Sequence, residues 1–410
     1  MNIAILAEFA VASGGAEKVA VESAWGLAEA GHAVTYLQAI DGPADALLDH
    51  PNIARIALHN TDIWDRPAHR AALSGLWDGP SAARLGAALD GLPVRPDLVH
   101  VHQWTRSLSP SLFPVLFARA LPVVVTLHDY FMACPNGVYY RFDTTAPCAL
   151  TPLSPGCLAA PCDGRSRLHK LVRTGRNAVL RTTLRRKRLD VIHVSDASVA
   201  RMGGLLAHLD LTHHRVDNPV RVARMAPADP ARGDAVAYVG RLTREKGADL
   251  VAAAAARAGL PALFIGTGPL EAELRAMPGV EVVGWRSPEA VWDTVRTRAR
   301  ALVAPSRWYE TGPLTVYEAL AHGIPVIAST RAGAAEKIVD GVNGFAVAPE
   351  VEALAGAMRR LSDDVALRAL GRAASDRYWT APMTLAAHAA ALGGVYARIR
   401  EARADLGRAA

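Results

Sequence analysis

The chain has 410 residues, a formal net charge of +6 and 51% hydrophobic residues. Its length exceeds what one hydrophobic core usually supports, so about two domains are expected. No apolar run reaches the roughly 18 residues of a membrane-spanning helix, and residues 1–7 lack the basic start and long apolar stretch of a signal peptide. The composition therefore argues against a membrane-spanning or secreted protein. It predicts a cytoplasmic protein that is soluble or bound at a membrane surface.

Short apolar segments alternate with helical segments along the whole chain. In the first half, strands are expected at residues 3–6, 34–38, 98–102, 123–127 and 191–194. In the second half, strands are expected at residues 235–239, 262–265, 280–283, 301–304, 326–328 and 344–347. Such alternation is typical of parallel sheets covered by helices. The predicted fold class is therefore α/β, with two similar units.

The two units are expected to meet in an exposed connector. Residues 217–234 are rich in Pro, Asp and Ala and show little periodicity, as a linker does. The N-terminal domain is therefore expected at 1–216 and the C-terminal domain at 217–384. The tail, 385–410, is helical in composition and is expected to pack back on the first domain.

Two features of the first half follow predicted strands. Gly14 and Gly15 form a small-residue loop after the first strand. Because ligands of open parallel sheets bind at the carboxyl ends of the strands, this loop can admit a phosphate group or an acceptor sugar, or it can be a plain connecting turn. His128 ends another strand, in VTLHDY, where it can donate to a hydroxyl or carbonyl of a ligand. A structural pair with Asp129 is the alternative.

All four cysteines fall in one stretch, at Cys134, Cys148, Cys157 and Cys162. This stretch is rich in proline and lacks periodicity, and a structural zinc ion would hold it in shape. The spacing argues against zinc because no pair has the tight C-x-x-C separation. Plain thiols are the alternative. A disulfide is less expected in a cytoplasmic chain, and no positioned base is evident for a catalytic thiol.

The stretch Arg165–Arg188 contains ten Lys or Arg residues and no acidic residue. Leucine and valine recur among them at spacings of three and four, which predicts a basic amphipathic helix. Such a helix can lie on an anionic membrane surface, or its apolar face can cover a domain core. Nucleic acid is not expected as a partner, because the stretch lacks interleaved aromatic residues and no recognition module accompanies it.

Three glycine turns follow predicted strands in the second half. Arg241 and Lys246 flank the first turn and can together neutralise a diphosphate, although surface cations commonly have no such role. The second turn, at 266–269, lacks the third glycine and the strand-end acid of a dinucleotide fingerprint, so a nicotinamide dehydrogenase is not expected. The third turn ends at Trp285, whose indole can stack on a nucleobase or can simply pack in the core or at a hinge.

The most informative stretch is ETGPLTVYE, in which Glu310 and Glu318 lie on either side of a helix start. Pro313 fits the first helical turn, so the helix is expected to begin near Leu314. The first N–H groups of a helix bind anions, and the two carboxylates can accept hydrogen bonds from hydroxyls. The arrangement predicts a phosphate flanked by sugars as its ligand.

Together these segments resemble the retaining GT-B glycosyltransferases, specifically glycosyltransferase family 4. The resemblance covers most of the chain and is carried by GGAEK, VHVH at 99–102, HDY, VGRLTREKG, the E-x7-E segment continued by ALAHGIPV, and GVNGF. It implies two Rossmann-like domains whose parallel sheets face each other across a cleft. One departure is Pro313, which follows Gly312 where many members have glycine. Proline cannot donate an N–H, so the phosphate contacts would come from Leu314 or Thr315.

By this resemblance, Glu310 would contact hydroxyls of the donor sugar, Glu318 the ribose, and Arg241 with Lys246 the leaving diphosphate. His128 matches the family's active-site histidine, which bonds the donor sugar. The family also implies retention, in which the departing phosphate can take the acceptor's proton and no enzymatic nucleophile is required. Glu310 as a nucleophile is the alternative. No D-x-D metal motif occurs in the chain, so fixed cations and a helix start are expected to replace a catalytic metal cofactor.

The sequence thus predicts a cytoplasmic hexosyltransferase that uses a nucleotide-sugar donor, either a UDP-sugar or GDP-mannose. The expected acceptor is a glycan or a lipid-linked glycan of envelope or extracellular polysaccharide synthesis. Arg165–Arg188 would hold the protein at the inner face of the cell membrane. Two other classes stay open, a nucleotide-sugar epimerase of the same fold and a non-catalytic nucleotide-sugar binding protein. No residue identifies the base, the sugar or the linkage.

Overall fold

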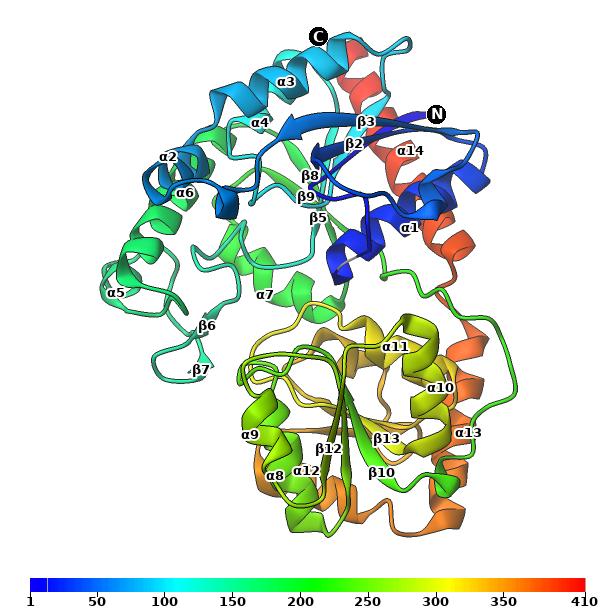
Figure 1. Cartoon of the computed structure of the whole chain (residues 1–410). Coiled ribbons are helices and arrows are strands. Elements are labelled where there is room, and N and C mark those ends of the chain that lie inside the picture. The colour runs from blue at the N-terminus through cyan, green and yellow to red at the C-terminus, as the bar shows by residue number, and fades with distance from the viewer. Residues whose placement is uncertain (13, 410) are drawn as a thin grey trace. The chain divides into compact units, whose positions relative to one another are not determined.

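The computed structural model describes residues 1–12 and 14–409. It divides the chain into two compact units (Figure 1). The N-terminal unit comprises Met1–Val138, Ala149–Pro219 and Met383–Ala410, and the C-terminal unit comprises Tyr139–Cys148 and Val220–Pro382. No helix among the described residues is both long and apolar enough to cross a membrane.

The N-terminal unit is built on a seven-stranded parallel sheet in the order β3-β2-β1-β4-β5-β8-β9. The strands are β1 (Asn2–Ala7), β2 (Ala33–Ile40), β3 (Ile53–Asn60), β4 (Leu98–Val101), β5 (Val123–Leu127), β8 (Leu189–His193) and β9 (Leu211–Arg215). Strand β1 lies near the centre, where Ile5 is fully buried and pairs with Tyr36 on one side and His100 on the other. Because the strands are parallel, their carboxyl ends share one edge of the sheet.

The helices of this unit are α1 (Gly15–Glu29), α2 (Ala68–Leu76), α3 (Gly79–Asp90), α4 (Leu112–Ala118), α5 (Pro155–Ala159), α6 (Arg167–Leu184), α7 (Asp196–Leu206) and α14 (Leu385–Ala409). Helix α14 packs against α1, as Figure 1 shows. Leu392 and Tyr396 of α14 join the core cluster that contains Leu27 of α1. The tail expected to return to the first domain thus lies in the N-terminal unit, and residue 410 lies outside the described residues.

The C-terminal unit is built on a six-stranded parallel sheet in the order β12-β11-β10-β13-β14-β15. Its strands are β10 (Ala235–Val239), β11 (Ala262–Ile265), β12 (Val280–Gly284), β13 (Ala299–Ala304), β14 (Val326–Ser329) and β15 (Gly344–Val347). Its helices are α8 (Ala248–Ala258), α9 (Glu271–Arg275), α10 (Pro288–Arg298), α11 (Leu314–Ala321), α12 (Val351–Arg359) and α13 (Asp364–Thr380). A short antiparallel hairpin, β6 (Tyr140–Arg141) with β7 (Ala146–Pro147), belongs to this unit by its contacts.

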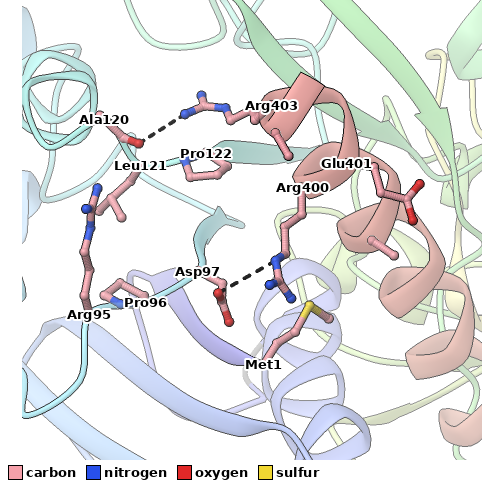
Figure 2. A pocket seen from close by; sticks show the side chains of 12 residues that line it. Met1, Arg95, Pro96, Asp97, Ala120, Leu121, Pro122, Arg400, Glu401 and Arg403 are labelled. Atoms are coloured by element: carbon pink, nitrogen blue, oxygen red, sulfur yellow. Dashed lines mark hydrogen bonds and ion pairs between the residues drawn. The ribbon is translucent and has the colours of Figure 1, made fainter. Parts of the chain in front are cut away.

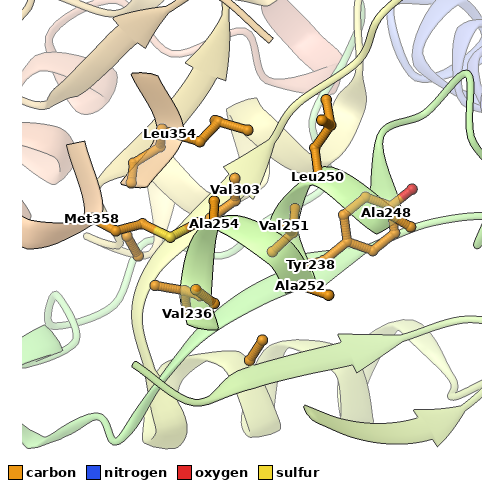
Figure 3. Packing of buried hydrophobic residues seen from close by; sticks show 14 of the residues in the cluster. Val236, Tyr238, Ala248, Leu250, Val251, Ala252, Ala254, Val303, Leu354 and Met358 are labelled. Carbon is orange, nitrogen blue, oxygen red and sulfur yellow. The ribbon is translucent and has the colours of Figure 1, made fainter. Parts of the chain in front are cut away.

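Alternation along β10 explains the two cores of this unit. Val236 and Tyr238 point to one face and pack with Val251 of α8 and Met358 of α12 (Figure 3). Ala237 points to the other face, into a separate cluster that α10 and α11 cover. Side chains of a strand alternate between faces, and burying each large apolar side chain contributes about 1.5–3 kcal/mol. A strand that is apolar at every position therefore holds helices on both faces.

The predicted α/β class with two Rossmann-like domains is confirmed. All eleven expected strands occur within a few residues of the predicted positions. The sequence missed β3 and β9, which lie at the two edges of the larger sheet. Both carry polar residues at several positions because an edge strand is only partly covered, and this weakens the apolar pattern.

The chain passes between the units at Pro219 and Val220, three residues beyond the expected boundary. The sequence placed Tyr139–Cys148 in the first domain, whereas its contacts group it with the C-terminal unit. The strands of this hairpin have only two residues each, which is too short to produce a periodic signal.

Candidate active site

Two loops at the carboxyl edge of the C-terminal sheet bring a cation and a carboxylate together. Lys246, in the loop after β10, donates from its ammonium group to Oε1 of Glu310, in the loop after β13. The hydroxyl of Ser306 donates to Oε2 of the same carboxylate. The structure therefore brings two of the predicted site residues into direct contact, although 64 positions separate them in the chain. Both oxygens of Glu310 are engaged.

The charge state of Glu310 follows from these contacts. Burial alone would raise the pKa of this carboxyl group, but the charge and hydrogen bond of Lys246, the hydroxyl of Ser306 and the charge of Arg241 hold it below its usual value. Glu310 is therefore ionised at neutral pH. It can accept hydrogen bonds from hydroxyls, but it has no proton to give as a general acid.

The two loops are fastened to each other by Arg307. Its guanidinium group forms two hydrogen bonds to Asp249 at the start of α8, with lengths of 2.7 and 2.8 Å, and its backbone N–H donates to the carbonyl of Glu245 at 2.9 Å. Gly247 lets the loops approach, because its φ is +79° and a Cβ there would lie 2.6 Å from the carbonyl of Pro305. These contacts fix where Lys246 lies relative to Glu310.

The glycine turn at 266–269 has a structural role that the sequence did not predict. A Cβ on Gly266 would lie 2.1 Å from the carbonyl oxygen of Gly240, so only glycine fits there. Tyr238 donates its hydroxyl to the carbonyl of Arg241 at 2.6 Å. The second turn therefore supports the first, and together they hold the backbone that carries Arg241, whose side chain is exposed.

The E-x7-E segment has the local structure that its sequence predicts. Helix α11 begins at Leu314, with Pro313 in the N-cap position at φ −66° and ψ 115°. Proline has no side-chain acceptor to cap the first turn. Gly312, Leu314 and Thr315 are partly exposed at this helix start, whereas Glu318 is buried one turn inside. The helix start can thus present N–H groups to an anion beside Glu310.

Trp285 follows β12 and is 72% exposed. The preceding residue, Gly284, has a φ of +76°, which turns the chain at the strand end. The exposure excludes the alternative that Trp285 packs in the core. The structure does not bring Trp285 into the cluster around Glu310.

In the N-terminal unit, His128 belongs to a row of histidines at the ends of β4 and β5. Its Nε2 lies 3.0 Å from Nδ1 of His102, and the ring of His102 lies 4.2 Å from that of His100. His100 lies 2.7 Å from both the Tyr396 hydroxyl and the Thr126 hydroxyl. The partner of His128 in this row is His102, and the sequence had assigned His102 no role although VHVH contained it.

Burial keeps this histidine row neutral. It lowers the pKa of His100 and of His128 to about 3, and that of His102 well below its usual value. A neighbouring histidine that became charged would lower these pKa values further. A neutral ring has one N–H and one acceptor nitrogen, so His128 can donate one hydrogen bond without carrying a charge.

Gly14 and Gly15 lie at the start of α1, at the carboxyl end of β1. Both are exposed. A Cβ on Gly14 would approach the Glu17 carboxylate to 2.6 Å. The loop is thus an exposed helix start at the carboxyl edge of the sheet. This is the position that the sequence predicts for it.

The cysteine stretch has no metal site in the part of the chain that the structure describes. No group of three or more His, Cys, Asp or Glu side chains there is arranged to hold a metal ion. The ammonium group of Lys170 instead donates to the carbonyls of Cys157 and Ala160 at the end of α5. Structural zinc thus stays a prediction without support from the geometry.

Helix α6 does not have the simple apolar face that its sequence predicts. Leu180 and Leu184 are buried, but Leu168 and Leu171 are 72% and 66% exposed. Lys170 and Arg176 are buried instead. The C-terminal half of the helix therefore covers the core, while its N-terminal half presents leucines to the surface.

A pocket of about 710 Å³ lies at the opposite edge of the N-terminal sheet, before β1, β4 and β5. Figure 2 shows Asp97 near Arg400, at 3.8 Å, and Arg403 donating to the carbonyl of Ala120 at 3.1 Å. The pocket contains none of the predicted site residues. Its position at the amino ends of the strands is not where parallel sheets bind ligands.

Comparison with known proteins matches both units to one enzyme class. Residues 13–147 match the model "Glycosyltransferase Family 4", and residues 233–364 match "Glycosyl transferases group 1". The D-inositol 3-phosphate glycosyltransferase of Mycobacterium avium is 27% identical over 347 residues, covering 79% of this chain and 73% of the relative. That of Mycobacterium sp. strain JLS is also 27% identical, and the match spans 64% of its length.

Solved structures show the same fold over nearly the whole chain. Sucrose-phosphate synthase from Thermosynechococcus elongatus has a TM-score of 0.69 at 20% identity, covering 98% of this chain and 99% of that one. Anabaena Alr3699/HepE in complex with UDP has a TM-score of 0.68 at 18% identity, covering 97% and 100%. Two Rossmann-like units of this kind define the GT-B glycosyltransferases. The chain belongs to glycosyltransferase family 4, with a group 1 domain in its C-terminal half.

Proposed function

We propose that the protein transfers a hexose-type sugar from a nucleotide-sugar donor to a glycan or lipid-linked acceptor, with retention at the anomeric carbon and without a catalytic metal. The observation that carries this proposal is the ion pair of Lys246 with the largely buried Glu310 carboxylate, beside Arg241 and the start of α11. The cations, the N–H groups of the helix start and the carboxylate that can accept hydrogen bonds from sugar hydroxyls all belong to the C-terminal unit.

The proposed chemistry follows from the charges. Cleavage of the sugar–phosphate bond leaves the electron pair on the diphosphate, and Arg241, Lys246 and the N–H groups of α11 would stabilise that charge. Lys246 has three donors, so it can keep its bond to Glu310 while contacting a phosphate oxygen. The acceptor hydroxyl would lose its proton to the departing phosphate on the same face.

The contacts of Glu310 favour a binding role over a nucleophilic one. Its two oxygens are held by Lys246 and Ser306, which lowers their nucleophilicity. A carboxylate held in this way would accept hydrogen bonds from sugar hydroxyls. His128, which is neutral and lies at the end of β5, would donate a hydrogen bond to the sugar.

A ligand screen tests the donor. UDP is proposed as the donor nucleotide because the related Anabaena structures hold UDP and UDP-glucose. At 100 times its Kd, a nucleotide adds about 2.7 kcal/mol to the folded state. Differential scanning fluorimetry with UDP, GDP and ADP should thus show the largest rise in Tm with UDP. A larger rise with GDP would assign a GDP-sugar, and no rise with any of the three would refute the proposal.

Two controls separate the other classes. An epimerase would isomerise the bound sugar nucleotide when no acceptor is present, which chromatography of the donor would reveal. A non-catalytic binding protein would show the Tm rise but would release no nucleoside diphosphate when acceptor is added.

We also propose a cytoplasmic location on the inner face of the cell membrane, for synthesis of envelope or extracellular polysaccharide. The support is the exposed basic segment that follows α6, formed by Arg185, Arg186, Lys187 and Arg188. Each cation near an anionic surface contributes about 1 kcal/mol to binding.

Replacing these four cations with alanine should therefore remove most binding to anionic vesicles in a flotation assay. The matched control removes four exposed arginines of the C-terminal unit, Arg257, Arg275, Arg286 and Arg360. This control changes the net charge equally and should float like the wild type. Equal flotation of the α6 variant and the wild type would exclude the proposed surface.

A further inference from the structure

The N-terminal unit contains a second pocket, of about 600 Å³, between α2 and α6. Glu8 lines it just after β1, Gln103 and Arg106 just after β4, and Asp129 just after β5. The pocket therefore lies at the carboxyl edge of the sheet, where parallel sheets bind ligands. Asp129 follows His128 directly, so the pocket adjoins the histidine row.

Arginine dominates the charge of this pocket, named here the arginine pocket. The arginines that line it are Arg66, Arg106, Arg165, Arg173 and Arg176. Three of them are neutralised by carboxylates, through Arg66 with Asp78, Arg106 with Asp62 and Arg173 with Asp163. Among the described residues, Arg165 and Arg176 form no ion pair with a carboxylate. Two cations are thus left to act on a ligand.

Arg176 is the more unusual of the two because it is buried. It is 7% exposed, its Nη1 donates to the carbonyl of Thr105 at 3.3 Å, and its guanidinium carbon lies 4.6 Å from the centre of the Phe131 ring. Burial lowers its pKa to about 10, so it still carries a charge at neutral pH. The charges of Asp129 and Glu8 favour the charged form of Arg176, although neither forms an ion pair with it in the described structure. An anionic ligand in direct contact would offset more of the cost of burying this cation.

The acids in the pocket balance this charge only in part. Glu8 accepts from the backbone N–H groups of Arg106 and Ser107, and Asp129 accepts from that of Phe131 at 2.8 Å. Burial raises the pKa of Glu8 to about 7 and that of Asp129 to about 6. Glu8 is therefore only partly ionised at neutral pH, whereas Asp129 is largely ionised and supplies one negative charge against the two arginines.

Two further features point to an anionic ligand. Nε of Arg106, a hydrogen-bond donor, is buried without a partner in the described structure, and Arg106 lines the pocket. Ser166, the N-cap residue of the 18-residue α6, and His169 in its first turn also line it. The positive end of the helix dipole thus adds to the arginine charge.

The remaining wall of the arginine pocket is apolar. Ile63, Trp64, Leu168 and Val172 are among the residues that form it. Leu168 itself is 72% exposed. Leu73 of α2 and Leu171 of α6, which do not line the pocket, are each 66% exposed on the same two helices. A ligand with an apolar part would cover surface that is otherwise exposed to water.

We propose that the arginine pocket binds the acceptor through a phosphate or diphosphate group joined to an apolar chain. Arg165 and Arg176 hold the anion, and the apolar wall of α2 and α6 holds the start of the chain. The assignment of this ligand as acceptor rests on the proposed glycosyl transfer, whereas its binding does not.

Isothermal titration of the full-length protein tests the pocket. The probes are farnesyl monophosphate, farnesol and glycerol 3-phosphate, each added in the presence of UDP so that the donor cations are occupied. Farnesyl monophosphate should bind at least about tenfold more tightly than either of the others, because only it offers both an anion and a chain. A polyprenyl phosphate in phosphatidylcholine vesicles should bind the protein in the same way.

Variants then assign the binding to the named residues. Arg165→Met and Arg176→Met should each weaken farnesyl monophosphate about tenfold and leave farnesol unchanged. Arg167→Met is the matched control, since Arg167 is exposed on the same helix and does not line the pocket. Arg165 is also exposed, so its variant should fold even if the loss of buried Arg176 disturbs the fold.

Three results would overturn the proposal. Equal affinity for farnesol and farnesyl monophosphate would exclude an anion site, and equal affinity for glycerol 3-phosphate would exclude the apolar chain and indicate a soluble phosphate. Unchanged binding by Arg165→Met would remove the arginine assignment. A protein that binds farnesyl monophosphate but no nucleotide would refute the proposed transferase function and keep the pocket, so the two failures are distinct.

Discussion

Replacement of Lys246 by Met is expected to lower kcat/KM for sugar transfer by about 10²–10³-fold, the usual effect of removing one group that stabilises developing charge. The lysine contacts Glu310 and is the less exposed of the two predicted diphosphate cations. Met keeps the length of the side chain but has no charge. The measurement is the initial rate of nucleoside diphosphate release with saturating acceptor.

The same substitution should also destabilise the protein. Glu310 would remain largely buried with only Ser306 and the more distant Arg241 to favour its charge, and breaking a buried pair in this way costs about 3–5 kcal/mol. The pKa of Glu310 should rise accordingly. In the double variant Lys246→Met with Glu310→Gln, the uncompensated charge is gone. Stability should then recover while activity stays low.

Arg244→Met is the control for this experiment. Arg244 lies in the same loop but is exposed, and it pairs with Asp249 and Glu273 at the surface. Its loss should change stability by less than about 1 kcal/mol and leave the rate near that of the wild type. If Lys246→Met kept wild-type kcat/KM, the diphosphate site would have to be elsewhere.

Lowering the pH from 7.5 to 4.5 is expected to destabilise the N-terminal unit strongly. Burial lowers the pKa of His100 and His128 to about 3 and that of His388 to about 4, and holds that of His102 far down. In the unfolded chain these groups titrate near their ordinary pKa of about 6.5. Between the two pKa values the unfolded state binds more protons, so stability falls as the pH falls.

The buried histidines lower the stability at acid pH, and two buried acids oppose this loss. Two pH units below an unfolded pKa of about 6.5, each buried neutral histidine costs up to about 2.7 kcal/mol. Glu8 and Asp129 act in the opposite direction, because burial raises their pKa to about 7 and about 6 and the folded state takes up their protons first. The two acids offset about half of the stability that the four histidines remove. The free energy of unfolding therefore falls by a net amount on the order of 5 kcal/mol.

Urea unfolding at several pH values measures this loss, and one histidine substitution assigns it. His388 lies 2.9 Å from the Ser23 hydroxyl and 2.7 Å from the carbonyl of Asp217, and an asparagine there can keep a hydrogen bond. His388→Asn should reduce the pH dependence of the unfolding free energy below pH 6.5. His59→Asn, at a side chain that is 72% exposed, should not change it. A wild-type stability that stayed constant to pH 4.5 would contradict the neutral histidine row.

Much of the fold and part of the site could be predicted from local sequence. Most strands could be predicted because buried parallel strands are apolar at nearly every position. The start of α11 near Leu314 could be predicted from Pro313, although the proline lies at the N-cap, one position before the first helical turn where it was expected. The expected roles of Arg241, Lys246 and Glu310 came from the resemblance to glycosyltransferase family 4, which short local motifs carry.

Other features depend on contacts between distant parts of the chain. Only the fold shows that Lys246 contacts Glu310, that Gly266 packs on Gly240, and that His102 is the partner of His128. The last two pairs come from loops after different strands, and the order of strands in the sheet decides which loops are neighbours.

The basic stretch Arg165–Arg188 shows the same division most clearly. Its composition and spacing were sufficient to predict a helix, because helix formation depends on residues three and four apart. Which face of α6 is buried depends on the sheet, on α2 and on the loops that surround it. For this reason Arg176 is buried while Leu168 and Leu171 are exposed, the reverse of what the pattern of charges alone would predict.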